Sequence, residues 1–150
     1  MGGNSSFYYT NPTPAVVPGL SAELVAATTA ATNAAAAANA QLAAYTVVTD
    51  TWSSSVTIDW SLANCHRLTL TGTPTALTFT NGVDGEKLIL ELKQDSVGSR
   101  LVTLPSNVRY STTIPSILLS TAANRIDKLG FMFNSVDGKY DLVAVSYGFI

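Results

Sequence analysis

The chain carries little charge. Charged residues make up 12% of its 150 residues, about half of the roughly 25% that is usual for soluble domains. The first 49 residues contain one charged side chain, Glu23. The eight Lys and Arg residues are scattered and the net charge is -2, whereas nucleic-acid binding needs clustered cations that displace counterions. The composition therefore argues against nucleic acid as a partner.

Cysteine and histidine occur once each, as the neighbours Cys65 and His66. One cysteine cannot form an intramolecular disulfide. Neighbours in a strand point to opposite faces, so these two side chains cannot act together as a nucleophile and its base. They also supply too few ligands for a zinc ion. The sequence therefore predicts no catalytic, cofactor-binding or metal-binding residues, and we expect a protein that is not an enzyme.

No apolar run has the composition of a membrane span. The alanine-rich stretch TTAATNAAAAANAQLAA is interrupted by Thr, Asn and Gln, and alanine contributes little transfer free energy. We therefore predict no membrane span. The start of the chain, MGGNSSFYYTNPTP, has neither the cationic beginning nor the compact apolar run of a secretory signal. Export by that route is not expected.

Proline dominates the first 20 residues. Pro12, Pro14 and Pro18 each fix φ and remove a backbone donor, which predicts an extended arm over residues 1–20. Such an arm has no core, and its adjacent aromatic residues would grip another protein. The residues predicted to anchor the chain are Tyr8, Tyr9, Pro12, Pro14 and, further along, Leu24. A disordered tail is the alternative interpretation of the same composition.

An alanine-rich helix with coiled-coil spacing is predicted over residues 21–45. Ser21 can cap the first turn, and Glu23 is placed favourably against the helix dipole. Alternating spacings of four and three, typical of a coiled-coil seam, connect Leu24, Thr28, Ala31, Ala35, Ala38, Leu42 and Tyr45. The residues predicted for a trimer seam are Ala31, Ala35, Ala38, Leu42 and Tyr45. Packing of the helix on its own β domain is the alternative, which the uncharged, small-residue faces disfavour.

Residues 46–150 are dominated by β signals. Short segments rich in β-branched, leucine or aromatic residues predict about eight strands, at 46–51, 56–60, 67–71, 75–80, 86–94, 100–104, 126–134 and 139–147. Strict alternation predicts a core of Leu68, Leu70, Leu77, Phe79, Leu88, Leu90, Leu92, Leu129, Phe131 and Phe133. Turn sequences such as Asn81-Gly82 and Asp137-Gly138 separate several strands. The stretch between Pro105 and Pro115 is predicted to be a loop or an edge excursion.

The predicted fold class is mainly β. An N-terminal extended arm and a long Ala-rich α-helix precede an antiparallel β-sandwich or jelly-roll knob, and the assembly is predicted to be trimeric. Three domains follow from this division, at residues 1–20, 21–45 and 46–150. Because the first two segments cannot form a core of their own, we expect assembly rather than catalysis as the function.

Two segments of the knob resemble a β module that closes many tail fibres and other surface proteins of tailed bacteriophages. They are GEKLILELKQDSVGSRLVTLPSNVRY, from Gly85, and LGFMFNSVDGKYDLVAVS, from Leu129. The module has a strand, a Gln-Asp turn with glycine, a strand ending in Pro-Ser-Asn, and two final strands joined by an Asp-Gly turn. Those places are taken here by Gln94, Asp95, Gly98, Arg100, Pro105, Ser106, Asn107, Asp137, Gly138 and Tyr140.

The resemblance implies a structural role on the virion surface and, since such modules are typically trimeric, a homotrimer. The alanine-rich helix after a proline-rich arm also resembles the attachment segment of phage fibres and head decoration proteins. No shaft separates helix and knob, which favours a short protein seated directly on capsid or tail proteins. The expected function is that of a capsid decoration, head-fibre or short tail-fibre protein that stabilises the particle.

An adhesion module is the alternative function. In that interpretation the knob binds a glycan or receptor of the host surface through exposed aromatic rings. The candidate glycan-contacting residues are Trp52, Trp60, Tyr110 and Tyr140. Aromatic residues in strands more often belong to the core, which favours the structural function over this one.

Overall fold

The computed structural model describes the backbone of residues 20–73 and 75–150, and the side chains of these residues except 20 and 40–45. The chain divides into two compact units, Met1–Ala38 and Asn39–Ile150. Most of the predicted arm lies outside the described residues, and so do the predicted anchors Tyr8, Tyr9, Pro12 and Pro14. The side chains of the predicted seam residues Leu42 and Tyr45 also lie outside them.

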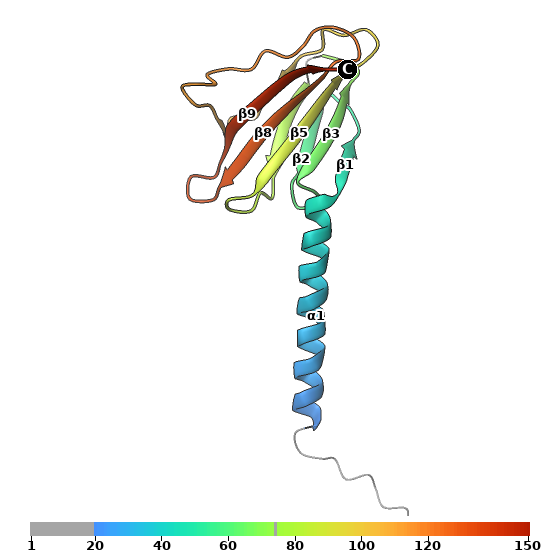
Figure 1. The fold of residues 1–150 in the computed structure, drawn as a ribbon, viewed down its shortest axis with the longest axis vertical. Coiled ribbons are helices and arrows are strands. Elements are labelled where there is room, and N and C mark those ends of the chain that lie inside the picture. Colours follow the sequence, from blue (N-terminus) through green and yellow to red (C-terminus); the bar gives the residue numbers. More distant parts are fainter. Residues whose placement is uncertain (1–19, 74) are drawn as a thin grey trace, which may run out of the picture. The chain divides into compact units, whose positions relative to one another are not determined.

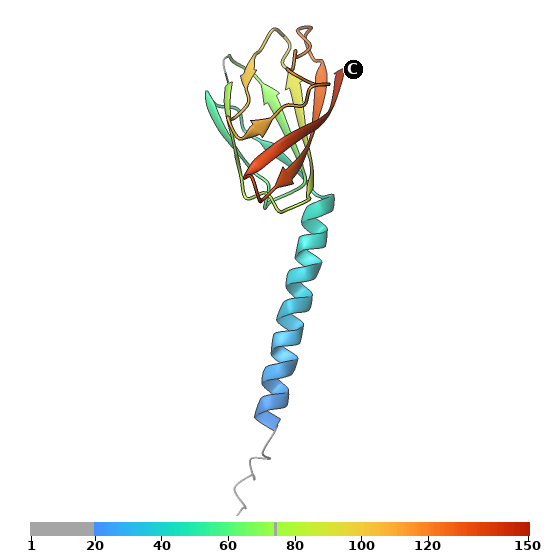
Figure 2. The same ribbon diagram turned by 90° about the vertical axis from the view of Figure 1, so that its left-hand side faces the viewer.

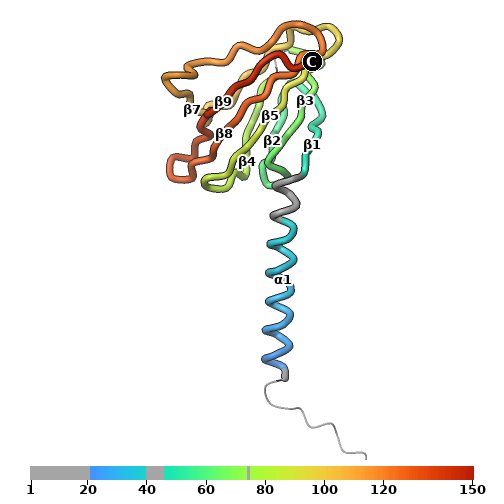
Figure 3. The backbone as a smooth tube through the Cα atoms, viewed as in Figure 1, coloured from blue at the N-terminus to red at the C-terminus, as the bar shows by residue number. Residues whose placement is uncertain are grey.

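The described residues contain one helix, α1 (Leu20–Tyr45), which is labelled in Figure 3. It begins one residue earlier than predicted, so Ser21 lies in the first turn rather than at the capping position. Three threonines along it return their hydroxyl hydrogen bonds to the carbonyl four residues earlier, as in Thr28 Oγ1 to Leu24 O at 2.8 Å. The same bond is made by Thr29 and Thr32. These bonds satisfy each hydroxyl within the helix.

The β unit consists of two sheets, which face each other in Figure 2. The six-stranded sheet has the order β1-β3-β5-β8-β9-β7, and Figure 1 labels all of its strands except β7. Its strands are β1 (Val47–Asp50), β3 (Cys65–Leu70), β5 (Lys87–Gln94), β8 (Ile126–Asn134), β9 (Lys139–Phe149) and β7 (Val108–Arg109). The three-stranded sheet has the order β2-β4-β6, formed by Ser55–Asp59, Thr75–Thr80 and Val102–Thr103. The prediction of a mainly β protein is confirmed.

The prediction of antiparallel pairing is wrong for most of this unit. From β1 to β6, consecutive strands alternate between the two sheets. The parallel pairs are β1 with β3 and β3 with β5 in the larger sheet, and β2 with β4 and β4 with β6 in the smaller one. β7 also pairs in parallel, with β9. Among the described pairings, only β5 with β8 and β8 with β9 are antiparallel. A turn sequence signals that the chain reverses direction, but here most reversals carry the chain across to the opposite sheet, so the flanking strands do not bond to each other.

The Asn81-Gly82 turn between β4 and β5 is one of these crossings. Asn81 has φ 58°, and its side chain donates to Asp59 Oδ1 at 2.8 Å. A Cβ atom on Gly82 would lie 2.7 Å from the Phe133 ring and 2.9 Å from the Tyr140 ring. Without a side chain, the Gly82 amide approaches closely and donates to the Tyr140 hydroxyl at 3.1 Å. Glycine is therefore needed here for close backbone approach.

The Asp137-Gly138 turn closes a hairpin between β8 and β9, as predicted. Gly138 has φ 63°, in the left-handed region that favours glycine. The side chain of Asn134 accepts hydrogen bonds from the amides of Val136 and Asp137, at 3.0 and 3.3 Å. The stretch between Pro105 and Pro115 contains only the two-residue strand β7 at the edge of its sheet. That prediction of an edge excursion is confirmed as well.

The hydrophobic core lies between the sheets. All predicted core residues are buried except Phe133, which packs against the core while partly exposed. Additional buried residues of the core include Val56, Ile58, Trp60, Tyr140 and Leu142. The rings of Trp60, Phe131 and Tyr140 surround Phe79, with centroids at 5.2–5.4 Å. Alternation identified the core because the pleat sends every second side chain to the same face.

The Gln94-Asp95 turn, which belongs to the resemblance to the phage β module, forms a hydrogen-bonded loop. Gln94, 2% exposed, donates to the Arg100 carbonyl at 3.0 Å and accepts from the Arg100 amide at 2.8 Å. Asp95 accepts from the amides of Val97 and Gly98 and from the Arg100 guanidinium, at 2.8–3.1 Å. Gly98 has φ 80°, and a Cβ there would lie 2.4 Å from the Thr121 carbonyl oxygen. The motif therefore specifies one tight, hydrogen-bonded loop.

This loop predicts an acid-sensitive contribution to stability. Hydrogen bonds from Arg100 and from the Gly98 amide lower the pKa of Asp95 to about 2, against about 3.9 in an unfolded chain. A carboxyl with a depressed folded pKa stabilises the protein above its unfolded pKa, and this contribution is lost as the pH falls from about 4 to about 2. Asp95→Asn should make the urea midpoint less dependent on pH across this window. An unchanged slope would contradict the assignment.

Candidate functional site

The surface of α1 is the first candidate site, because its described side chains are mostly small and uncharged. Every described helix side chain, from residue 21 to 39, is exposed. Leu24 and Val25 are 62% and 67% exposed. The threonine hydroxyls bond within the helix, so their methyl groups add to the apolar surface. One side chain in this stretch is charged, Glu23.

The predicted seam residues whose side chains are described lie along this surface. Ala31, Ala35 and Ala38 are exposed, and their spacing places them on one face of a helix. Burying a methyl group contributes roughly 0.8 kcal/mol, so three alanines supply about 2 kcal/mol per helix. The loss of translational and rotational freedom on association costs about 4 kcal/mol or more. These alanines permit close helix packing, but stable assembly needs further contacts.

The outer face of the six-stranded sheet is the second candidate surface. Strand register aligns a row of uncharged residues across it, which consists of Val47, Cys65, Ile89, Gly130 and Ala144. Val47 and Ile89 are 46% and 45% exposed. The sequence contained a signal for this row that alternation alone did not use: Ile89 stands between Leu88 and Leu90, so one residue on the outer face of β5 is a large apolar one.

A charged row runs beside this uncharged one. Arg67 Nε donates to Glu91 Oε1 at 2.6 Å, and Lys128 Nζ lies 3.3 Å from Glu91 Oε2. Burial of Glu91 opposes its ionisation, but the hydrogen bonds from Arg67 and Lys128 outweigh burial and lower the pKa of its carboxyl. The Glu91 charge is therefore held within the sheet face by two neighbouring cations.

Cys65 and His66 lie on opposite faces of β3, as predicted. His66 is fully buried, with Nδ1 2.9 Å from Asp50 Oδ2 and Nε2 3.1 Å from the Asp59 carbonyl oxygen. Its ring also packs edge-on against Trp60, with centroids 5.0 Å apart. Burial raises the pKa of the Cys65 thiol, which disfavours the reactive thiolate. Both side chains therefore belong to the framework of β3, one on each of its faces.

The four aromatic candidates for glycan contact do not form one surface. Trp60 and Tyr140 are buried in the core, at 1% and 2% exposure, which excludes their rings as stacking platforms. Trp52 packs against the core, its Nε1 donates to Thr75 Oγ1 at 2.8 Å, and its ring lies directly against Gly72. Tyr110 is 40% exposed. It is the candidate whose ring remains most available to a ligand.

In the part of the chain that the structure describes, no three His, Cys, Asp or Glu side chains are grouped so as to hold a metal ion. The helix described there is not long and apolar enough to cross a membrane.

Comparison of the chain with protein-family models, with curated proteins and with solved structures found no match in any of the three.

Proposed function

We propose that this chain is a structural protein of a bacteriophage virion. In this proposal a homotrimer is attached to capsid or tail proteins through residues 1–45 and displays its β unit on the particle surface as a capsid decoration, head-fibre or short tail-fibre protein. The observation that carries the proposal is the surface of α1. A helix gains most of its stability by packing an apolar face, and the described side chains of α1 from 21 to 39 are all exposed in the single chain.

The composition of that surface supports partners that are other protein chains. Alanine and threonine methyl groups allow helices to approach closely, and the one charge near the start, Glu23, leaves the seam from Ala31 onward uncharged. Assembly requires more burial than the alanines provide, and contacts between the β units would add it within the trimer. The proline-rich arm predicted over residues 1–20 would instead bind the capsid or tail surface. In this proposal the protein stabilises the particle and displays its β unit on the particle surface.

The resemblance supports the virion location. Its residues in the described chain build a loop after β5 and the β8–β9 hairpin, features that maintain a fold rather than perform a reaction. A module defined by such features is consistent with a structural role. The trimer and the phage setting rest on this resemblance together with the heptad spacing of the helix.

Light scattering tests the assembly. The full chain is expected to have the mass of a trimer, and Ala35→Asp is expected to shift it towards monomer, because each seam position would place a carboxylate against its copies. Ala37→Asp is the matched control: it lowers helix propensity equally but lies about 200° around the helix from Ala35, and it should leave the trimer intact. A monomeric full chain, or equal effects of the two variants, would contradict the predicted trimer seam.

Attachment is tested separately from assembly. A chain that lacks residues 1–20 is expected to remain trimeric and to lose attachment to particles from which the native protein has been removed. Retained attachment would contradict the role of the arm, while the trimer mass would still report on the helix.

A further inference from the structure

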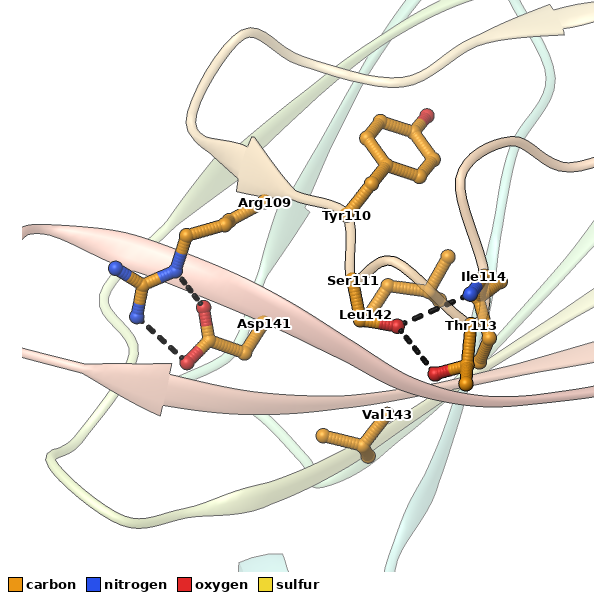
Figure 4. Close-up of a pocket in the computed structure, with 8 residues that line it drawn as sticks. All are labelled: Arg109, Tyr110, Ser111, Thr113, Ile114, Asp141, Leu142 and Val143. Carbon is orange, nitrogen blue, oxygen red and sulfur yellow. Dashed lines mark hydrogen bonds and ion pairs between the residues drawn. The ribbon is translucent and has the colours of Figure 1, made fainter.

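A groove opens beside β9, where the short strand β7 ends. β7 pairs with β9 through Val108 with Tyr140 and Arg109 with Asp141. Beyond Arg109 the chain leaves the sheet, and a groove of about 400 Å³ lies between this segment and the following part of β9. Figure 4 shows that its walls come from the segment that follows β7 and from β9. Its volume lies in the range of small-ligand sites, roughly 300–1,000 Å³.

One end of the groove holds an array of hydrogen-bond donors and acceptors. Arg109 donates to both carboxylate oxygens of Asp141, at 2.6 and 2.8 Å, and to Asp137 at 2.7 Å. Hydrogen bonds from Arg109 lower the pKa of the Asp141 carboxyl, and the two carboxylates raise the pKa of the guanidinium. Three of the five guanidinium N–H groups are used in these bonds, so donors remain beside carboxylate lone pairs.

The other end of the groove is an ordered turn. Ser111 Oγ accepts from the Ile114 amide at 3.0 Å and lies 3.0 Å from the Thr113 hydroxyl. Tyr110 also lines the groove, with its ring and hydroxyl directed away from the ion pair and from this turn (Figure 4). Burial raises the pKa of the Tyr110 hydroxyl, although the side chain keeps 40% of its surface exposed. The groove lining therefore combines an aromatic residue with hydrogen-bonding side chains.

We propose that this groove is a binding site for a neutral saccharide. A pyranose has an apolar face of C–H groups, which suits the Tyr110 ring, and hydroxyls that both donate and accept, which suit the Arg109–Asp141 pair. The pair and Asp137 together carry a net charge of -1, which repels carboxylated sugars. Charge thus selects neutral sugars over sialic or uronic acids. Of the four aromatic residues proposed from the sequence for glycan contact, Tyr110 is the one that lines this groove.

Saturation-transfer NMR of the full chain tests the site. The probes are neutral trisaccharides of glucose, galactose and mannose, with sialyllactose as the acidic counterpart. At least one neutral trisaccharide is expected to receive saturation, and sialyllactose is expected to receive none. Tyr110→Ala should weaken binding about tenfold or more, since an aromatic contact of about 1.4 kcal/mol corresponds to a factor of ten.

Three variants separate the ring, the ion pair and general surface effects. Tyr110→Phe keeps the ring face and should keep binding, whereas Asp141→Asn should reduce it. Tyr147→Ala removes a tyrosine of similar exposure, 47%, that lies outside the groove lining, and should leave binding unchanged. The proposal is overturned if no neutral trisaccharide binds, if sialyllactose binds as well as they do, or if Tyr110→Ala and Tyr147→Ala behave alike. Circular dichroism confirms that each variant is folded.

Discussion

Phe79→Ala is expected to lower the free energy of unfolding of this protein by about 4 kcal/mol, the effect of removing a large, fully packed ring. Phe79 is 4% exposed and projects from β4 in the smaller sheet. Its ring meets those of Phe131 and Tyr140 from the larger sheet in edge-to-face contacts, at 5.3 and 5.2 Å. The substitution would therefore leave a cavity at the centre of the contact between the two sheets.

Urea denaturation at a fixed protomer concentration measures this loss, because the stability of an oligomer depends on concentration. Val136→Ala is the matched control. It also truncates an apolar side chain, but Val136 is 90% exposed, so a change within about 0.5 kcal/mol is expected. A Phe79→Ala variant as stable as this control would show that the two sheets do not depend on the aromatic contact.

His66→Leu is expected to lower the free energy of unfolding by about 3 kcal/mol. The fully buried ring lies within hydrogen-bond distance of the Asp50 carboxylate in β1 and of the Asp59 carbonyl at the end of β2. It therefore connects the edge strand of one sheet to the other sheet. Leucine fills similar space but leaves the Asp50 side chain, 13% exposed, without its partner.

The double variant His66→Leu with Asp50→Leu separates lost packing from an unpartnered carboxylate. Removing both polar partners is expected to recover part of the loss, since replacing a buried pair by apolar residues costs less than removing one member. Chemical denaturation of the single variants and the double variant completes the cycle. If the double variant loses as much as the sum of the single variants, the histidine and the aspartate are not coupled.

The two proposals concern different units of the chain and can fail independently. The seam of α1 is tested by molecular mass and by a pair of aspartate substitutions in one helix. The groove beside β9 is tested by saccharide binding and by a pair of tyrosine substitutions in the β unit. A trimer that binds no sugar would leave the structural function in place, whereas a monomer that binds sugar would favour the adhesion function.

Positions of strands and core residues could be predicted because they depend on local geometry. The pleat sends alternate side chains to one face, and this periodicity identified Leu88, Leu90 and Leu92 as core residues. The Asp137-Gly138 hairpin could be predicted for a similar reason, since a left-handed glycine defines its own turn. Phe133 was the exception, because it follows the same alternation but is only partly buried against the core.

Sequence alone determined where this chain extends, turns and buries its aliphatic residues, since each of these depends on a few neighbouring residues. Tertiary structure alone decided which strands pair, that Trp60 and Tyr140 enter the core, and that Arg109 meets Asp141 across 32 positions. These outcomes depend on contacts between distant segments. A turn reverses the chain without choosing its partner strand, and a polar or aromatic side chain in a strand is compatible with either face until the opposite sheet covers it.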